Sequence, residues 1–136
     1  MPIRSATEAD IDSLLPFEHL GREALCRCAR GGFVYAVELD GETVGVLRYG
    51  LFWQAIPFLD LIFLAPKARG KGIGAEAVRL WEAEMKLRGF YDVLTSTQAD
   101  ETARRFYEKL GYRRAGGFYP PGQQAEELIY SKRLEE

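Results

Sequence analysis

A glycine-rich turn is the part of this sequence best suited to bind a charged ligand. Residues 69–74 read Arg-Gly-Lys-Gly-Ile-Gly and follow an apolar run, Phe58 to Leu64. Glycine has no side chain to hold a ligand away from the main chain. The next segment has helical periodicity, and the first turn of a helix presents unpaired N–H groups at its positive end. The turn therefore predicts a site for phosphate oxygens, with Arg69 and Lys71 adding positive charge nearby.

Two common phosphate-binding loops do not match this spacing. A nucleoside-triphosphatase loop requires Gly-Lys followed by Ser or Thr, whereas Gly72 follows Lys71 here. A dinucleotide fingerprint requires G-x-G-x-x-G and an acidic residue after the next strand. The spacing here is G-x-G-x-G, and the next predicted strand ends Leu-Thr-Ser-Thr at residues 94–97. The remaining readings are another kind of phosphate loop or a purely structural glycine turn.

The elements expected around the turn alternate between strands and helices in the order β-α-α-β-β-β-α-β-α-β-β. The predicted strands are 2–6, 33–39, 43–53, 58–64, 92–96, 112–115 and 128–132, and the predicted helices are 7–16, 22–29, 72–87 and 103–110. Asp40-Gly41 predicts a tight hairpin turn. Thr7 and Asp10 predict a capping box at the first helix.

Charge and apolar patterning assign faces to the longest helix. Ala77, Val78, Trp81 and Met85 are expected in the core, and Glu82 and Lys86 are expected to form an exposed i,i+4 pair.

Composition limits the class of protein. The chain of 136 residues predicts one domain, 1–136, and its net charge of −2 gives no general attraction to nucleic acid or a membrane. Cys26 and Cys28 are the only cysteines and His19 is the only histidine, so we expect reduced thiols and no metal site. No signal segment or spanning run is evident, which favours a cytoplasmic protein.

Two motifs together resemble a known family, the GNAT N-acetyltransferases. Arg69-x-x-Gly72-x-Gly74 is similar to the family's pyrophosphate loop, Gln/Arg-x-x-Gly-x-Gly/Ala. Asp100 to Tyr112 reads Asp-Glu-Thr-Ala-Arg-Arg-Phe-Tyr-Glu-Lys-Leu-Gly-Tyr and resembles the second motif, Asn-x-x-Ala-x-x-Phe-Tyr-Glu-Lys-Leu-Gly-Phe. With the segments between them, the motifs cover residues 58–115.

The resemblance implies both a fold and an activity. The fold would be the GNAT acyl-CoA N-acyltransferase fold, α/β (α+β), with a mixed, mostly antiparallel sheet of six to seven strands, splayed at its central parallel pair, and about four helices on both faces. The activity would be transfer of acetyl from acetyl-CoA, as co-substrate, to a primary amine of a small molecule or peptide. Homodimers are common in the family, and the sequence does not decide the oligomeric state.

The resemblance also assigns residues to the cofactor. The strand before the turn would pair with the pantetheine arm, and the turn itself would surround the pyrophosphate. The residues concerned are Ile62, Phe63 and Leu64 along the pantetheine and Arg69, Gly70, Lys71, Gly72, Ile73, Gly74 and Ala75 around the pyrophosphate. Asp100 stands where the family has Asn, so it either contacts the cofactor or caps the following helix.

The catalytic residues are less closely defined. Tyr107 matches the family tyrosine that protonates the departing thiolate, although its apolar stripe also fits a core position. The positions where the family places a general base hold Phe58 and Thr95, which cannot accept a proton. Asp60 is therefore the candidate base or amine anchor, acting through a water; the alternative is an edge residue or the partner of an arginine. Tyr49, Trp53 and Phe118 are candidates for the acceptor side or the core.

A protein of a different class would share these features. A GNAT-fold module that binds acyl-CoA as a sensor, without transferring the acyl group, is the main alternative to an enzyme. A nucleotide-binding domain is the third hypothesis.

Overall fold

The helices and strands follow the order predicted from the sequence. The computed structural model describes residues 2–99 and 102–134, so Asp100 lies outside the described residues. The strands are β1 (Ile3–Ser5), β2 (Val34–Leu39), β3 (Glu42–Phe52), β4 (Ile56–Leu64), β5 (Asp92–Gln98), β6 (Arg113–Phe118) and β7 (Glu127–Arg133). The helices are α1 (Ile11–Leu14), α2 (Arg22–Arg30), α3 (Ile73–Leu87) and α4 (Ala103–Lys109), with 3-10 turns η1 (Glu8–Asp10), η2 (Leu15–Phe17) and η3 (Pro66–Ala68).

The strands belong to a 7-stranded sheet in the order β1-β2-β3-β4-β5-β7-β6. Pairing is antiparallel between β1 and β2, between β2 and β3, and between β7 and both of its neighbours, and it is parallel between β4 and β5. The parallel ladder is short: Phe58 pairs with Leu94, and Leu59 pairs with Thr95. The predicted mixed α/β fold, with a mostly antiparallel sheet that contains one parallel pair, β4 and β5, is confirmed.

The chain divides into two compact units. The first unit comprises residues 2–50 and 60–81, and the second comprises residues 51–59 and 82–134. The glycine-rich turn and Asp60 belong to the first unit, whereas Tyr107 belongs to the second.

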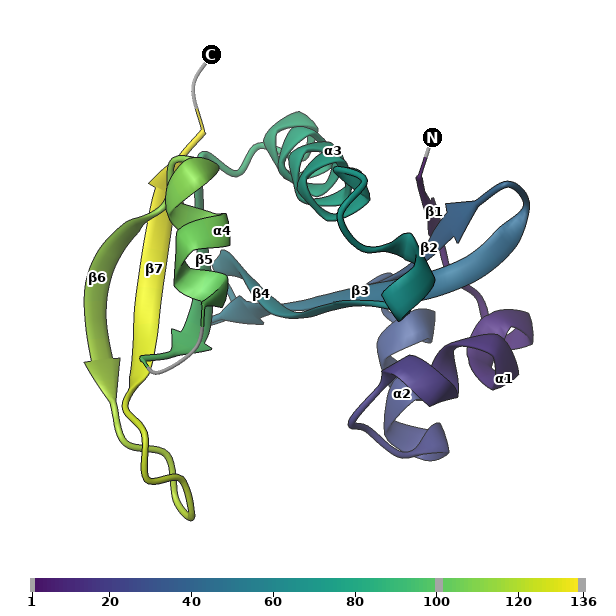
Figure 1. Cartoon of the computed structure of the whole chain (residues 1–136), viewed down its shortest axis with the longest axis horizontal. Coiled ribbons are helices and arrows are strands. Elements are labelled where there is room, and N and C mark those ends of the chain that lie inside the picture. Colours follow the sequence, from purple (N-terminus) through teal and green to yellow (C-terminus); the bar gives the residue numbers. More distant parts are fainter. Residues whose placement is uncertain (1, 100–101, 135–136) are drawn as a thin grey trace. The chain divides into compact units, whose positions relative to one another are not determined.

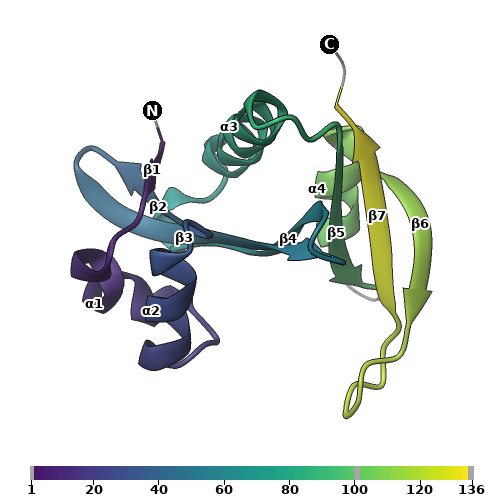
Figure 2. The ribbon, with the colours of Figure 1, turned by 180° about the vertical axis from the view of Figure 1, so that it is seen from behind.

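In the first unit, helices cover both faces of β2 and β3. Figures 1 and 2 show α1 and α2 on one side of these strands and the start of α3 on the other. Side chains of a strand alternate between its faces, and the buried residues of β2 accordingly enter two different clusters. Val34 and Ala36 pack with Leu14 and Leu25 from α1 and α2. Val37 packs in a separate cluster with residues of β3, η3 and α3, namely Val44, Ala68 and Ile73.

Two local predictions in the first unit are confirmed. Asp40 and Gly41 both have positive φ, 53° and 78°, as a tight turn between twisted strands requires. The side chain of Thr7 accepts a hydrogen bond from Ala9 N, and Asp10 accepts one from Thr7 N, which completes the capping box.

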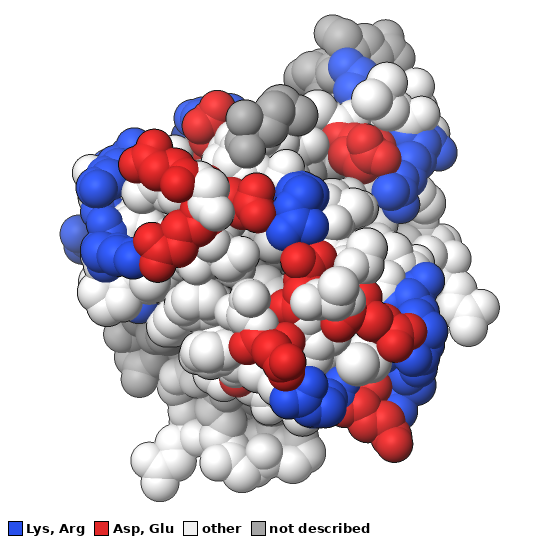
Figure 3. Space-filling model, turned by 90° about the vertical axis from the view of Figure 1, so that its right-hand side faces the viewer, with Lys and Arg blue, Asp and Glu red and all other residues white. Residues whose placement is uncertain are grey.

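The exposed face of the first unit carries charges of both signs. Arg4 of β1 pairs with Asp10 and Glu38, and Arg30 of α2 pairs with Glu8. Figure 3 shows basic and acidic side chains interspersed on this face rather than gathered into a field of one sign. Such a surface gives no general attraction to a polyanion.

The second unit is built on β5, β7 and β6. The register of β5 and β7 runs from Asp92↔Arg133 to Gln98↔Glu127. Figures 1 and 2 show α4 lying over one face of these strands. The edge strand β6 is exposed along its whole length, and its pairing with β7 shifts register between Arg114 and Gly116.

One prediction on α3 is wrong. Glu82 was expected on an exposed face, but it is buried and 7% exposed. It accepts hydrogen bonds from Tyr112 Oη at 2.7 Å and from Lys132 Nζ at 2.8 Å. Helical periodicity predicts only which residues of the same helix are neighbours. The partners of Glu82 lie 30 and 50 residues further along the chain, so the pattern could not indicate them.

Within residues 2–99 and 102–134, no helix is both long enough and apolar enough to cross a lipid bilayer.

Candidate active site

The glycine-rich turn joins η3 to α3 in the first unit. Gly70 and Gly72 have φ values of 75° and 80°, which other residues rarely adopt. A Cβ atom built on either glycine would meet nothing within 4 Å, so the space beside both residues is open. The helix begins at Ile73, and its first N–H groups have no intrahelical partner by construction. The backbone here is therefore bare, accessible and positively polarised, which fits phosphate oxygens.

Apolar side chains hold this turn in place from beneath. Ala68 and Ile73 flank the turn and are 0% and 8% exposed. They pack against Val37 and Val44 of the sheet. The residues on either side of the turn are thus buried, while Gly70 and Gly72 lie on the surface.

Arg69 is bound to the end of β4. Its Nε donates to Leu64 O at 2.9 Å, and its guanidinium carbon lies 5.1 Å from the centre of the Phe63 ring. Ala65 N donates to Val44 O of β3. Along a strand the backbone groups of successive residues point to opposite sides, so those of Leu64 point away from β3. Arg69 therefore donates to the carbonyl of Leu64 that points away from β3, and Leu64 is one of the residues expected along the pantetheine. The sequence did not indicate this contact.

Among the described residues, Asp60 has one charged partner, and that contact is long. Its Oδ2 accepts from Arg48 Nη1 at 3.4 Å, and its side chain is 38% exposed. Partial burial raises the pKa of Asp60, Arg48 opposes this effect, and the nearby carboxylate of Glu18 adds to it. The arginine partner foreseen as the structural alternative is thus present, but it leaves most of the carboxylate's acceptor capacity free.

Tyr107 is packed inside the second unit. It is 6% exposed, and its ring makes edge-on contacts with Phe106 and Tyr112 at centroid distances of 5.1 and 5.6 Å. Tyr112 in turn donates to Glu82, and burial, followed by the effect of the Glu82 carboxylate, raises the pKa of Tyr112 strongly. Tyr107 therefore borders a buried polar network.

The other residues singled out from the sequence have different surroundings. Thr95 Oγ1 donates to Leu59 O and is buried, which leaves it a structural role. Tyr49 is 3% exposed and packs against Trp81, so it is a core residue. Trp53 and Phe118 are exposed, 79% and 52% respectively, so neither belongs to the core.

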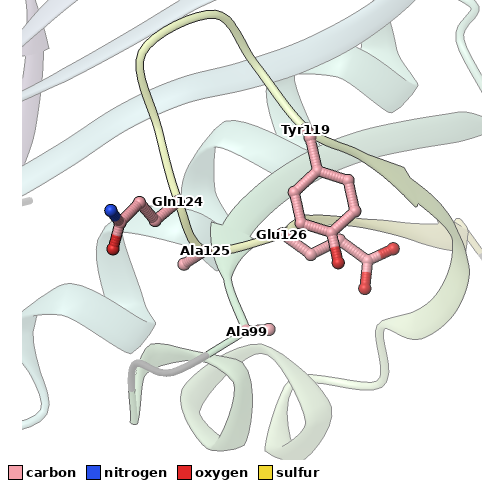
Figure 4. Close-up of a pocket in the computed structure, with 5 residues that line it drawn as sticks. All are labelled: Ala99, Tyr119, Gln124, Ala125 and Glu126. Carbon is pink, nitrogen blue, oxygen red and sulfur yellow. The ribbon is translucent and has the colours of Figure 1, made fainter.

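The second unit has a hollow of about 510 Å³ that the sequence did not indicate. Its lining residues are Ala99, Tyr119, Gln124, Ala125 and Glu126. Figure 4 shows the Tyr119 ring and the Glu126 carboxylate on one side of this hollow and Gln124 on the other. The sequence signal for it would have been Tyr119 beside two prolines in a loop between two predicted strands.

Metal ions in proteins are held by arrangements of His, Cys, Asp and Glu side chains. Among the described residues, no three of these side chains gather closely enough to hold an ion, and both cysteines are free.

Solved structures of acetyltransferases share this architecture. The ribosomal-protein-alanine N-acetyltransferase of Brucella melitensis is 25% identical, with a TM-score of 0.82 over 98% of this chain and 100% of that one. A Bacillus anthracis acetyltransferase named for streptothricin was solved in complex with acetyl coenzyme A. It is 18% identical, with a TM-score of 0.68 over 75% of this chain and 62% of that one. The fold is thus that of an acetyltransferase.

Sequence comparison specifies the family. A model described as the Acetyltransferase (GNAT) family matches residues 4–112. Blasticidin-S acetyltransferase from Streptomyces morookaense is 32% identical over 99 residues, which span 70% of this chain and 71% of that protein. This chain belongs to the GNAT acetyltransferase family and is an enzyme of the acyltransferase class.

Proposed function

We propose that this chain transfers acetyl from acetyl-CoA to a primary amine of a small molecule or peptide, by direct attack in a ternary complex. The observation that carries the proposal is the open backbone at Gly70 and Gly72, directly before the N-terminus of α3. Family membership supports it, as does the relative named for acetylation of blasticidin S. The two units would act together as one catalytic domain, 1–136.

The proposed cofactor contacts follow the first unit. Main-chain N–H groups of residues 70–75 would bind the pyrophosphate, and Arg69 and Lys71 would add charge that draws the anion in. Residues 62–64 would run along the pantetheine arm. Because Arg69 is bound to Leu64 O, we expect that arginine to move when the arm pairs with this carbonyl.

The proposed chemistry conserves atoms and protons. The acceptor arrives as an ammonium and loses a proton to Asp60, directly or through a water. The free amine attacks the thioester carbonyl carbon, a C–N bond forms, and the C–S bond breaks as the tetrahedral intermediate collapses. Tyr107 donates a proton to the thiolate of CoA and recovers one from the nitrogen. Each role would contribute through general acid–base catalysis, typically 10²–10⁴-fold.

The first test measures acetyl-CoA binding by thermal shift. Saturation at a hundred times Kd should add about 2.7 kcal/mol to the free energy of unfolding. Gly72→Val should abolish this gain, because a branched side chain would occupy the open space beside the turn. Gly122→Val is the matched control: Gly122 has φ 79° and open space as well, so it carries the same backbone strain. A stabilisation that survives Gly72→Val would overturn the proposed cofactor site.

The second test identifies the acceptor. A broad panel of primary amines is incubated with acetyl-CoA, thiol release is followed, and acetylated products are identified by mass spectrometry. Tyr107→Phe should bind acetyl-CoA normally and turn over more slowly. Acetyl-CoA binding with no thiol release from any amine would instead favour the sensor module.

A further inference from the structure

Three charged side chains of the first unit form a chain of contacts. Glu18 follows η2, Arg48 lies on β3, and Asp60 lies on β4. Arg48 Nε donates to Glu18 Oε2 at 2.7 Å, and Arg48 Nη1 donates to Asp60 Oδ2 at 3.4 Å. The guanidinium of Arg48 therefore contacts two carboxylates, that of Glu18 closely and that of Asp60 at a longer distance.

The first of these contacts, between Arg48 and Glu18, is short and buried. The Glu18 side chain is 0% exposed and that of Arg48 is 13% exposed. The second oxygen of Glu18 accepts from His19 N at 3.0 Å and from Leu20 N at 3.3 Å. With both oxygens engaged, Glu18 fixes the guanidinium of Arg48, and breaking this buried pair would leave a charge without compensation.

The second contact, between Arg48 and Asp60, is longer, and a glycine of β3 lies beside it. Gly50 is two residues after Arg48 and lies on the same face of β3. A Cβ atom built on Gly50 would lie 3.4 Å from Asp60 Oδ2. The Asp60 carboxylate thus lies beside Gly50, is contacted by Nη1 of Arg48, and remains partly exposed to solvent.

We propose that Arg48, held by Glu18, is a positioning residue that orients the Asp60 carboxylate and balances its charge for proton transfer from the acceptor amine. The inference rests on the proposed role of Asp60 in the reaction. Among the residues that the structure describes, Arg48 and Glu18 are the charged groups that act on the Asp60 carboxylate, and they do so in opposite directions. Arg48 stabilises the ionised carboxylate, whereas Glu18 destabilises it and also draws the guanidinium away.

The test is a direct titration of Asp60 by ¹³C NMR, with its carboxyl signal assigned by loss in Asp60→Asn. Arg48→Met should raise the pKa of Asp60, and Glu18→Gln should lower it, because each removes one of the two opposing charges. Arg48→Lys should give a pKa between those of Arg48→Met and the wild type, since lysine keeps the charge without the forked geometry. Arg30→Met removes an exposed arginine of the same unit and should leave the pKa unchanged.

A second readout separates this inference from the proposed function. The acidic limb of the kcat/KM profile should move with the measured pKa, and each unit of displacement should change kcat/KM on that limb by about tenfold. Absent shifts, or shifts of the same sign in Arg48→Met and Glu18→Gln, would overturn the role of Arg48 even if the enzyme is fully active. If the pKa of Asp60 shifts in opposite directions in the two variants but the kcat/KM profile does not move, Asp60 has no role in proton transfer. The positioning role of Arg48 would then be wrong as well.

Discussion

Glu82 in the second unit and Asp60 in the first are carboxylates in contrasting surroundings. Glu82 is buried and accepts short hydrogen bonds from Tyr112 and Lys132, one on each oxygen. Asp60 is 38% exposed, and its one charged partner within residues 2–99 and 102–134 is Arg48, at 3.4 Å. The sequence suggested the reverse, with Glu82 on an exposed helical face and Asp60 inside an apolar run.

The difference shows which carboxylate is available for chemistry. A carboxylate whose oxygens are both bonded to fixed donors contributes to the structure, and moving a proton onto it would break those bonds. A carboxylate with unused acceptor capacity and a raised pKa can exchange a proton with a substrate at a smaller cost. Saturation of the oxygens is therefore a better guide than the polarity of the surrounding sequence.

Removing Glu82 should have the largest effect on stability. Glu82→Ala leaves the partly buried Lys132 ammonium and the buried Tyr112 hydroxyl without their acceptor and should cost about 3 kcal/mol of unfolding free energy. Chemical denaturation measures this loss. Glu84→Ala is the control on the same helix, because Glu84 pairs with Arg88 at the surface and should contribute about 0.5 kcal/mol or less. Equal losses of unfolding free energy in Glu82→Ala and Glu84→Ala would contradict the structural role assigned to Glu82.

Replacing Asp60 should affect activity and leave stability intact. Asp60→Asn should lower kcat/KM by about 10²-fold or more, as expected for a lost proton acceptor. Its melting temperature at pH 7 should equal or exceed that of the wild type. Because the folded state raises the pKa of Asp60, ionisation costs stability as the pH rises from the ordinary value through the folded one. Asparagine removes that cost, so a melting temperature below that of the wild type at pH 7 would contradict this account.

Asp10 extends the comparison to a carboxylate at a helix start, where we expect the smallest effect. Arg4, followed by the Thr7 N–H, holds the pKa of Asp10 below its usual range. Asp10→Ala should cost about 1 kcal/mol near pH 7 by loss of the capping box. The stabilisation is present above the unfolded pKa of about 3.9 and disappears as the pH falls through the lower folded value. Denaturation of both proteins across this range measures it, and a constant difference down to pH 2 would be inconsistent with the assigned pair.

Features encoded by neighbouring residues were predictable from the sequence. The Asp40-Gly41 turn and the Thr7–Asp10 capping box depend on contacts within a few residues, and both are confirmed. Element order was likewise correct because periodicity and turn residues agree along the chain. Boundaries were less accurate: β4 begins at Ile56, although Pro57 suggested a later start, and β5 continues to Gln98.

Contacts between distant residues were not predictable. Periodicity places Asp60 on a strand, but the register that brings Arg48 to it, and the loop that brings Glu18 to Arg48, exist only in the folded chain. The same holds for Glu82, whose partners are 30 and 50 residues away. The glycine-rich turn was recognisable because its function would reside in the main chain, which needs no distant partner.

The two outer strands of the sheet bear on how this enzyme behaves at high concentration. β1 is 3 residues long and carries Arg4, while β6 carries Arg113 and Arg114 and an irregular register beside them. Short length, positive charge and a local bulge each hinder another strand from docking edge to edge. Both edge strands are thereby protected against edge-to-edge pairing with another molecule, which would lead to aggregation.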